Sequence, residues 1–276
     1  MSPATVQIFT ASSSATAPAE CAGHVLISGS YGGEYNAFHA GKRGIRGVVL
    51  NDAGVGRDGA GIRGLAYLDR VGLPGATADA NSCHIGDGEH MLACGVISHV
   101  NESAQRYGCA VGQSVHQCAE HMRAAPIVAA EMPPIRGGGR YVLREIPGEP
   151  PVIALDAAPM LEASDAGSIV VTGSHAALFR GKPDGLIQPD VYAIFFSDAG
   201  VGLDDAGVTR LPLLDERHIV AGAASAESAA IGDARSIYAD GVLSRVNATA
   251  RAAGGTPGTR VRDFIERLIA RAKGAG

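Results

Sequence analysis

Short apolar runs that end in glycine or a polar residue recur along this chain, and the whole series occurs twice. The stretch 48–56, VVLNDAGVG, is matched 146 residues later by 194–202, IFFSDAGVG. The likeness continues on both sides of these stretches. The pattern therefore predicts two copies of one unit, residues 1–125 and 151–276, with residues 126–150 between them as a linker.

Four pairs of uninterrupted apolar runs predict strands in the two copies. The matched runs are 6–9 with 152–155, 24–30 with 168–174, 48–52 with 194–198, and 74–80 with 219–225. Runs of this kind are typical of strands covered on both faces, as in a parallel sheet. Helical spacing of apolar residues separates the runs, which implies right-handed crossovers. We therefore predict an α/β fold of two tandem, doubly wound, mainly parallel-sheet units, with one continuous sheet across both copies as the alternative.

Three helices are predicted in each copy after the third run. Asp58 and Asp204 are placed to cap the first of these helices. The second is predicted from near residue 87 to 108 in one copy and from near residue 233 to 253 in the other. The last has a one-sided apolar pattern, which is clear over residues 261–268.

The linker differs from both copies in composition. It contains Pro133-Pro134 and the glycine run 137–139, which are typical of turns and irregular segments. A short strand is predicted within it at residues 141–143.

Composition and charge narrow the classes of function. The chain has 276 residues, of which 46% are hydrophobic, enough for a large buried core. A formal net charge of −5 provides no basic field for a phosphate backbone, so no nucleic-acid partner is expected. No run of about 18 apolar residues occurs, so no membrane partner is expected either.

The cysteines indicate a reducing compartment. Five occur, an odd number, and all lie in the first copy: Cys21, Cys83, Cys94, Cys109 and Cys118. A disulfide scaffold would pair its cysteines and spread them along the chain. Residues 1–20 lack the basic start and apolar run of a signal peptide. We therefore expect reduced thiols and a cytoplasmic protein, and a homo-oligomer as the usual default.

Candidate chemistry gathers at the ends of the predicted strands. In open α/β sheets, ligands bind beyond the carboxyl ends of the strands, so two related halves predict a cleft for a small-molecule substrate between their rims. The turn after the second run contains Ser30, Gly32 and Gly33, and Ser174 matches Ser30 in the other copy. The amides of such a turn can bind a carboxylate or phosphate. The alternative is a tight turn in which the serine caps a helix.

Asp52 and Asp198 follow the third run in each copy. A carboxylate at this place can act as a general base, bind a divalent metal or hold a ligand hydroxyl. The alternative is an Asx-turn, in which the carboxylate accepts hydrogen bonds from its own loop. The spacing of histidines and cysteines does not match a zinc site. No cofactor is therefore predicted, with a divalent ion at the two aspartates as the alternative.

The segment 81–87 supplies a candidate nucleophile. Cys83 is predicted near a strand end and before a helix, whose dipole can lower the pKa of a thiol. Its thiolate is a candidate nucleophile or base, and the alternative is a small buried apolar side chain. Ser82 and His84 beside it, and Ser228 in the second copy, are candidate substrate-binding residues.

The duplicated α/β halves resemble in architecture the amino-acid racemases of the aspartate and glutamate type. The resemblance implies one cysteine in each half, on opposite sides of the substrate carbon. In this chain Ala229 occupies the position that matches Cys83, which opposes racemisation by two cysteines.

The sequence favours an enzyme that acts on a small anionic or amide-bearing metabolite, with hydrolysis of a C–N bond as the leading prediction. Cys83, or a water activated by Asp52 or Asp198, would attack the substrate. His175 would transfer protons, and the amides of 29–33 would hold negative charge. One alternative is an isomerase, racemase or lyase that removes a proton beside a carbonyl. Another is a protein that binds a small ligand without catalysis.

Overall fold

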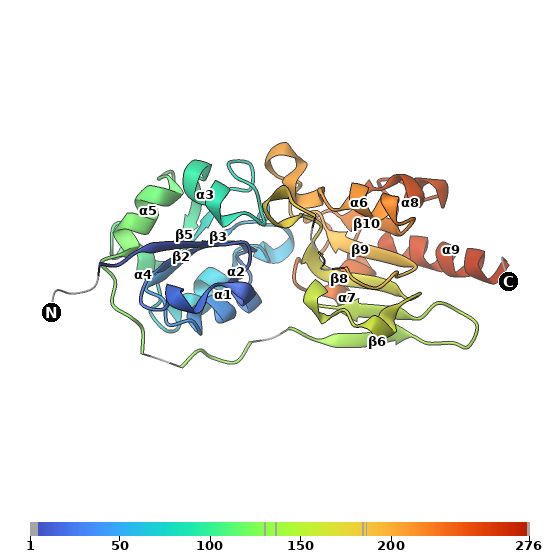
Figure 1. Ribbon diagram of the computed structural model, residues 1–276, viewed down its shortest axis with the longest axis horizontal. Helices are drawn as coiled ribbons and strands as arrows, with labels where there is room; N and C mark the ends of the chain where they lie inside the picture. Colours follow the sequence, from blue (N-terminus) through green and yellow to red (C-terminus); the bar gives the residue numbers. More distant parts are fainter. Residues whose placement is uncertain (1–4, 130, 136, 184, 186, 275–276) are drawn as a thin grey trace.

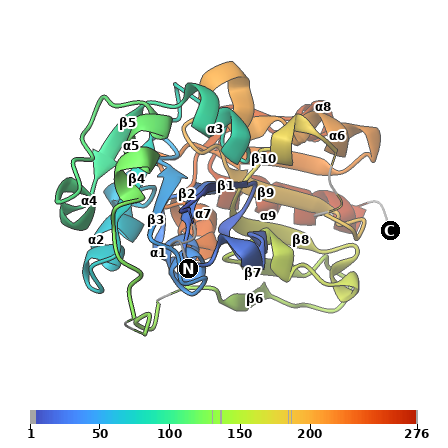
Figure 2. The same cartoon turned by 60° about the vertical axis from the view of Figure 1, so that its left-hand side comes forward.

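The computed structural model describes residues 5–129, 131–135, 137–183, 185 and 187–274, and it contains two β-sheets side by side (Figure 1). Parts of the predicted units and linker, at residues 1–4, 130, 136, 184, 186 and 275–276, lie outside the described residues. The first copy forms one sheet, and the second copy forms the other together with a strand of the linker; we call these two parts the first and second halves. The described parts of the linker lie along the lower edge of the molecule in the two views (Figures 1 and 2).

The first half contains a five-stranded sheet. Its strands are β1 (Ile8–Ala11), β2 (Val25–Tyr31), β3 (Gly47–Asn51), β4 (Gly75–Ala78) and β5 (Ile97–Val100). They lie in the order β1-β2-β3-β4-β5. The first four strands are parallel, and β5 is antiparallel to β4.

The second half repeats this sheet and adds one strand. Its strands are β6 (Arg140–Arg144), β7 (Val152–Leu155), β8 (Ile169–His175), β9 (Ala193–Ser197), β10 (Val220–Ala224) and β11 (Leu243–Val246). The strands β7 to β10 are parallel, and β6 and β11 pair antiparallel at the two edges. The strand predicted inside the linker is thus β6. The predicted α/β fold of two mainly parallel units is confirmed, and the alternative of one continuous sheet is wrong.

Helices connect the strands in both halves. The α-helices are α1 (Glu34–Gly41), α2 (Arg63–Asp69), α3 (Gly88–Cys94), α4 (Glu102–Gln105), α5 (Val115–Met122), α6 (Leu211–Glu216), α7 (Ala234–Asp240), α8 (Ala248–Ala252) and α9 (Val261–Gly274). Among the described residues, no helix has the length and apolar character that crossing a membrane requires.

Both faces of the first sheet are covered, as its uninterrupted apolar strands predict. Successive side chains of a strand point to opposite faces. In β2, Ile27 packs into one cluster with Met91 of α3 and Met122 of α5. Its neighbour Leu26 packs into another cluster with Ala37 of α1 and further residues of α2. The second sheet is divided between two clusters in the same way.

The long helix predicted from 87 to 108 is wrong, and so is its counterpart in the second copy. Helix α3 ends at Cys94, the backbone of its C-cap Gly95 is extended, and β5 follows. Asn101 then caps α4, because its side chain accepts the N–H of Ala104 at 2.8 Å. The same side chain accepts the N–H of Gly75 in β4 at 2.9 Å. This asparagine ties the sheet to the next helix, and Asn247 does the same in the second half.

The predicted caps Asp58 and Asp204 are also wrong. Both residues have a φ of +54° in short 3-10 turns, and the N-caps of α2 and α6 are Ile62 and Arg210. The chain turns tightly here before the helix begins.

Candidate ligand-binding cleft between the two halves

The loops that follow β3 and β9 join the two halves. In the first loop, residues 53–56 all have positive φ, and residues 199–202 repeat the values closely. Val55 is among them at +63°, a backbone conformation that β-branched residues rarely adopt. Gly54 and Gly200 meet at the boundary, where a Cβ atom added to Gly54 would lie 2.9 Å from the Cα atom of Gly200. The close approach therefore requires glycine.

Asp52 and Asp198 hold these two loops. Asp52 Oδ1 accepts the N–H groups of Gly54 and Ala80, at 2.9 and 3.0 Å. Asp198 Oδ1 accepts the equivalent pair in the second half, at 2.9 and 2.8 Å. The Ser244 hydroxyl donates to Asp198 Oδ2 at 2.6 Å. These contacts are those of the Asx-turn interpretation, and a catalytic role for either aspartate stays a prediction.

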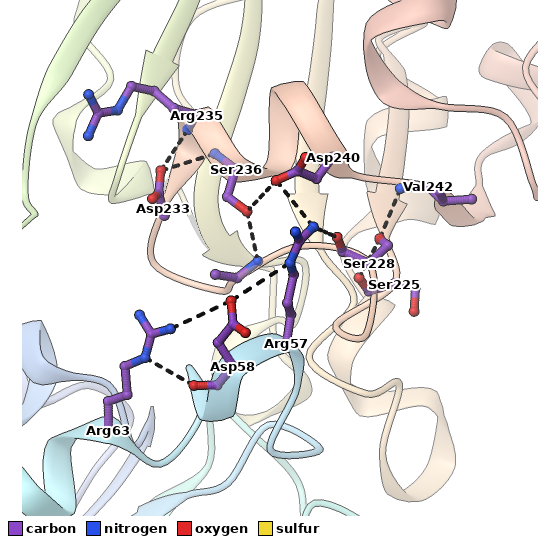
Figure 3. A network of polar contacts seen from close by, with 11 residues as sticks. Arg57, Asp58, Arg63, Ser225, Ser228, Asp233, Arg235, Ser236, Asp240 and Val242 are labelled. Carbon is purple, nitrogen blue, oxygen red and sulfur yellow. Dashed lines mark hydrogen bonds and ion pairs between the residues drawn. The ribbon is translucent and has the colours of Figure 1, made fainter.

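A polar network crosses the boundary beside these loops (Figure 3). The Arg57 guanidinium lies 3.2 Å from the Asp240 carboxylate and donates to the carbonyl oxygen of Ser228 at 2.7 Å. On its other side, Arg57 lies 3.8 Å from Asp58. Asp58 in turn contacts Arg63 through its carbonyl oxygen, at 3.2 Å. These contacts connect Asp240 of the second half, through Arg57 and Asp58, to the side chain of Arg63 in the first half.

A cleft of about 460 Å³ opens at this boundary. Its wall in the first half includes Tyr31, Gly33, Glu34 and Arg63. Its wall in the second half includes the turn 230–232 with Asp156, Asp233 and Arg235, and the linker glycines 137 and 138. The volume lies within the range of about 300–1,000 Å³ that small-molecule sites occupy.

Tyr31 is the last residue of β2 and has its side chain in the cleft. The side chain is 8% exposed, and its hydroxyl makes no hydrogen bond to any part of the chain that the structure describes. Burial, with a smaller effect of the nearby Asp156 carboxylate, raises the pKa of the phenol well above its usual value. The group therefore stays protonated at neutral pH and can donate a hydrogen bond into the cleft.

The N-terminus of α1 faces the same cleft. Its N-cap is Gly33, which has no side chain to accept the first N–H groups of the helix. These groups lack partners inside the helix, and the helix dipole adds positive potential. Asn36 fixes the helix to the end of β2 by donating to the carbonyl oxygen of Tyr31 at 2.9 Å. The N–H groups at the start of α1 and the Tyr31 hydroxyl are therefore held close together, and both can donate hydrogen bonds into the cleft.

The opposite wall is acidic. Asp156 follows β7, and its two carboxylate oxygens accept the N–H groups of Ala234 and Gly139, at 3.1 and 2.8 Å. Asp233 caps α7 by accepting the N–H groups of Arg235 and Ser236. The Arg235 guanidinium stacks on the ring of Tyr141 in β6, 4.3 Å from its centre.

On the side of the boundary related to the cleft by the duplication, the segment after β8 contacts the first half. His175 stands where the first half has Tyr31, and its Nδ1 accepts the N–H of Ala177 at 3.2 Å. The segment that follows contacts the first half, because the N–H of Arg180 donates to Gly86 and its guanidinium lies 2.9 Å from Glu89. We call this side, where the segment after β8 crosses the boundary, the closed site.

Cys83 does not have the environment expected of a thiolate. It is fully buried, with the Asp79 carbonyl oxygen and the Asn51 side chain at 3.5 and 3.7 Å from its sulfur. Burial raises the pKa of the thiol to about 12. Helix α3 begins five residues later, at Gly88, and the effect of its dipole is outweighed. The role of Cys83 stays a prediction, with the buried apolar alternative closer to these contacts.

The predicted substrate-binding serines are bonded within their own halves. Ser30 Oγ accepts the N–H of Ser14, and Ser174 Oγ accepts that of Ala158. Ser82 and Ser228 each donate to a carbonyl oxygen of the preceding turn, at 2.7 and 2.8 Å.

Two further predicted binding residues lie outside the cleft lining. His84 contacts Asp204 across the boundary at 2.9 Å, and Gly32 is packed against the backbone of Gly61. Of the predicted site residues, Gly33 is the one that lines the cleft.

Sequence reasoning missed the other residues of the cleft. Tyr31 and Asp156 have a signal in the sequence, since each stands where a strand ends at the carboxyl edge of its sheet. Arg63 and Arg235 have no such signal, because they are exposed residues in the first turns of helices.

The described residues contain no group of three or more histidine, cysteine or carboxylate side chains arranged to hold a metal ion. The divalent ion considered for Asp52 and Asp198 stays a prediction.

Fold and cleft together define an α/β protein of two related halves with a polar pocket at their boundary. Comparisons of the chain with models of protein families, with curated proteins and with solved structures found no match.

Proposed function

We propose that this protein binds a small metabolite with an anionic group in the cleft between its halves. The observation that carries the proposal is the Tyr31 hydroxyl, which is buried in the cleft beside the uncapped start of α1. The ring is largely buried, and the hydroxyl has no hydrogen-bond partner among the described residues, so it is available to a ligand in the cleft. An anionic oxygen in the cleft would accept hydrogen bonds from the phenol and the helix amides together.

Arg63 supports the same proposal. Its guanidinium lines the cleft beside Gly33, and 48% of its side chain is exposed. Its contact with the Asp58 carboxylate is long, at 4.0 Å, so the guanidinium can also contact a ligand. A carboxylate or phosphate bound there would face a positive charge and a helix N-terminus, the usual combination for anions.

Catalysis in the same cleft is the second candidate, and the pairing of Tyr31 with Asp156 favours it. A phenol that keeps its proton can stabilise an oxygen on which negative charge develops, and a carboxylate nearby can accept a proton. Hydrolysis of a C–N bond remains the reaction proposed from the sequence. Proton abstraction beside a carbonyl would use the same two groups.

Binding can be tested with purified protein and a panel of small carboxylates and phosphate esters, with and without an amino group. Melting temperature should rise with at least one of them, because a ligand that binds the folded state stabilises it. Tyr31→Phe should then weaken the dissociation constant about tenfold, the cost of one hydrogen bond to a charged group. Tyr107→Phe, outside the cleft lining, is the matched control. Unchanged binding in Tyr31→Phe, or no binder in the panel, contradicts the proposal.

The catalytic candidate needs a second readout on the same samples. Product formation over hours from a bound compound, lost in Tyr31→Phe, supports an enzyme. A compound that binds and is recovered unchanged supports a binding protein.

The location and assembly proposed from the sequence are the cytoplasm and a homo-oligomer. Light scattering after size exclusion measures the assembly directly, and a mass near 28.0 kDa would contradict the oligomer.

A further inference from the structure

We infer that the ligand of the cleft carries a cationic nitrogen as well as its anionic group. The inference rests on the proposed function. It concerns the wall of the cleft in the second half, whose carboxylates an anionic group cannot bind. Donors line the wall of the first half, namely the Tyr31 phenol, the start of α1 and Arg63. Carboxylates line the wall of the second half, namely Asp156 and Asp233.

These two carboxylates lack a cationic partner among the residues that the structure describes. Asp156 is 7% exposed, and its contacts are two backbone N–H groups. Asp233 binds two N–H groups through Oδ1 at 3.0 Å, and none of the hydrogen bonds between described residues involves its Oδ2. A carboxylate offers about four acceptor positions, so both retain capacity toward the cleft.

The two arginines of the cleft do not neutralise this wall. The Arg235 side chain is turned away from Asp233 to stack on Tyr141, and its contact to Asp233 is through the backbone (Figure 3). Arg63 belongs to the other wall, where it contacts Asp58. Neither arginine therefore pairs with the side chain of Asp156 or Asp233.

Ligands with a single sign of charge fit the two walls poorly. Glu34 adds a third carboxylate to the lining, against two guanidiniums, so a purely anionic ligand would be repelled by the acidic wall. A purely cationic ligand would offer no acceptor to the Tyr31 hydroxyl and would face the Arg63 guanidinium. A ligand with an ammonium or guanidinium group at one end and a carboxylate or phosphate at the other satisfies both walls.

The closed site on the other side of the boundary lacks part of this arrangement. The strand registers match Ile8 of β1 with Val152 of β7, so the position that matches Asp156 is occupied by Ser12, and the position that matches Tyr31 by His175. Asp87 matches Asp233 and likewise caps its helix. The acidic residue and the phenol thus occur together on the side where the cleft is open.

The test uses matched pairs of compounds. The probes are the common L-amino acids, 4-aminobutyrate and phosphoethanolamine, each beside the analogue in which a hydroxyl replaces the amino group. Calorimetry at pH 7 measures both members. The ammonium-bearing member of the binding pair is expected to bind at least about tenfold more tightly, because charged hydrogen bonds are roughly twice as strong as neutral ones.

Asp233→Asn ties the effect to the acidic wall. Asparagine keeps an Oδ1 acceptor and caps helices well, so α7 should remain folded. The variant should bind the ammonium-bearing member about tenfold more weakly, and the hydroxyl analogue no more weakly than the original protein does. Asp87→Asn, the matched change at the closed site, should alter neither.

The outcomes separate this inference from the function on which it rests. If hydroxyl analogues bind as tightly as their amino partners, the cationic nitrogen is wrong while anion binding in the cleft stands. Equal loss for both members in Asp233→Asn likewise overturns the inference. If no member of either set binds, both the inference and the proposed anion site are rejected.

Discussion

The backbone N–H of Arg57 donates to the carbonyl oxygen of Ala226 across the boundary between the halves, at 2.7 Å. The same bond occurs on the other side, where the N–H of Leu203 donates to Ala80 at 2.9 Å. Asp198 holds the first acceptor in place by binding the N–H of Ala226. The aspartates at the strand ends therefore stabilise the backbone bonds that join the two halves.

Asp198→Ala is expected to lower the free energy of unfolding by roughly 2–4 kcal/mol, since two backbone N–H groups and the Ser244 hydroxyl lose a charged acceptor. Urea denaturation at pH 7 measures the change.

Asp52→Ala is the matched comparison for this prediction. Asp52 accepts two N–H groups but no serine hydroxyl, because Ser98 donates to the Thr77 carbonyl oxygen instead. Its loss should be smaller by about 1 kcal/mol, the worth of one hydrogen bond. Wild-type stability in Asp198→Ala would show that this carboxylate does not hold the boundary, and would strengthen the case for chemistry at Asp198.

Gly200→Ala should separate the halves. The added Cβ atom would lie 2.8 Å from the Cα atom of Gly54, and the φ of +72° adds backbone strain. We expect a loss of more than about 2 kcal/mol, or unfolding in two steps as the halves lose contact. Gly72→Ala isolates the backbone part, because its φ is +74° and nothing lies within 4 Å. Equal losses in the two variants would mean that the close approach does not matter.

The duplication and the parallel strands could be predicted from the sequence because buried strands leave long apolar runs. The strands β5 and β11 could not, since each has four residues between two short helices and shows no period of its own. Asn101 carried the missing signal. Asparagine is favoured at helix N-caps, so Asn101, directly before α4, indicates that a new helix begins there rather than that an earlier one continues.

The cleft could be predicted in its position and not in its residues. Tyr31 and Asp156 come from different halves, and their meeting depends on how the two sheets are placed. For Cys83, the sequence predicts the position correctly but the pKa of the thiol in the wrong direction. Its place before α3 indicates a lowered pKa, whereas the packing around it, which sequence spacing does not reveal, raises the pKa.

Alkylation of the cysteines should reflect this burial. Iodoacetamide at pH 7 should modify Cys94 first, because it is exposed while the other four are buried thiols. Mass spectrometry of the peptides gives the order of labelling. Native Cys83 labelled as fast as Cys94 would restore the nucleophile hypothesis.

The burial of Cys83 also affects stability. The unfolded thiol loses its proton near pH 9 and the folded one near pH 12, so the folded form is stabilised below pH 9 and loses that stability as pH rises between these values.

Arg140→Met is expected to destabilise the protein most at neutral pH. The guanidinium in β6 binds both oxygens of Asp165, whose side chain is 1% exposed, and it holds the pKa of that carboxyl below its usual value of 3.8. The variant leaves a buried carboxylate with the N–H of Glu162 as its remaining partner. A loss of about 2–3 kcal/mol is expected at pH 7, somewhat less than for a fully buried pair.

The loss of stability in Arg140→Met should be larger at pH 7 than at pH 3. A carboxyl with a lowered folded pKa contributes stability above pH 3.8 that is lost as pH falls further. In the variant, burial without the guanidinium raises the pKa of Asp165, so the carboxyl is protonated by pH 3 and its missing partner matters less. Urea denaturation at pH 7 and pH 3 should therefore show a large difference from wild type at pH 7 and a small one at pH 3. Arg123→Met, which removes an exposed pair with Glu120, should cost less than about 1 kcal/mol at either pH. A loss in Arg140→Met that is the same at both pH values would mean that packing of β6, rather than the buried charge, accounts for it.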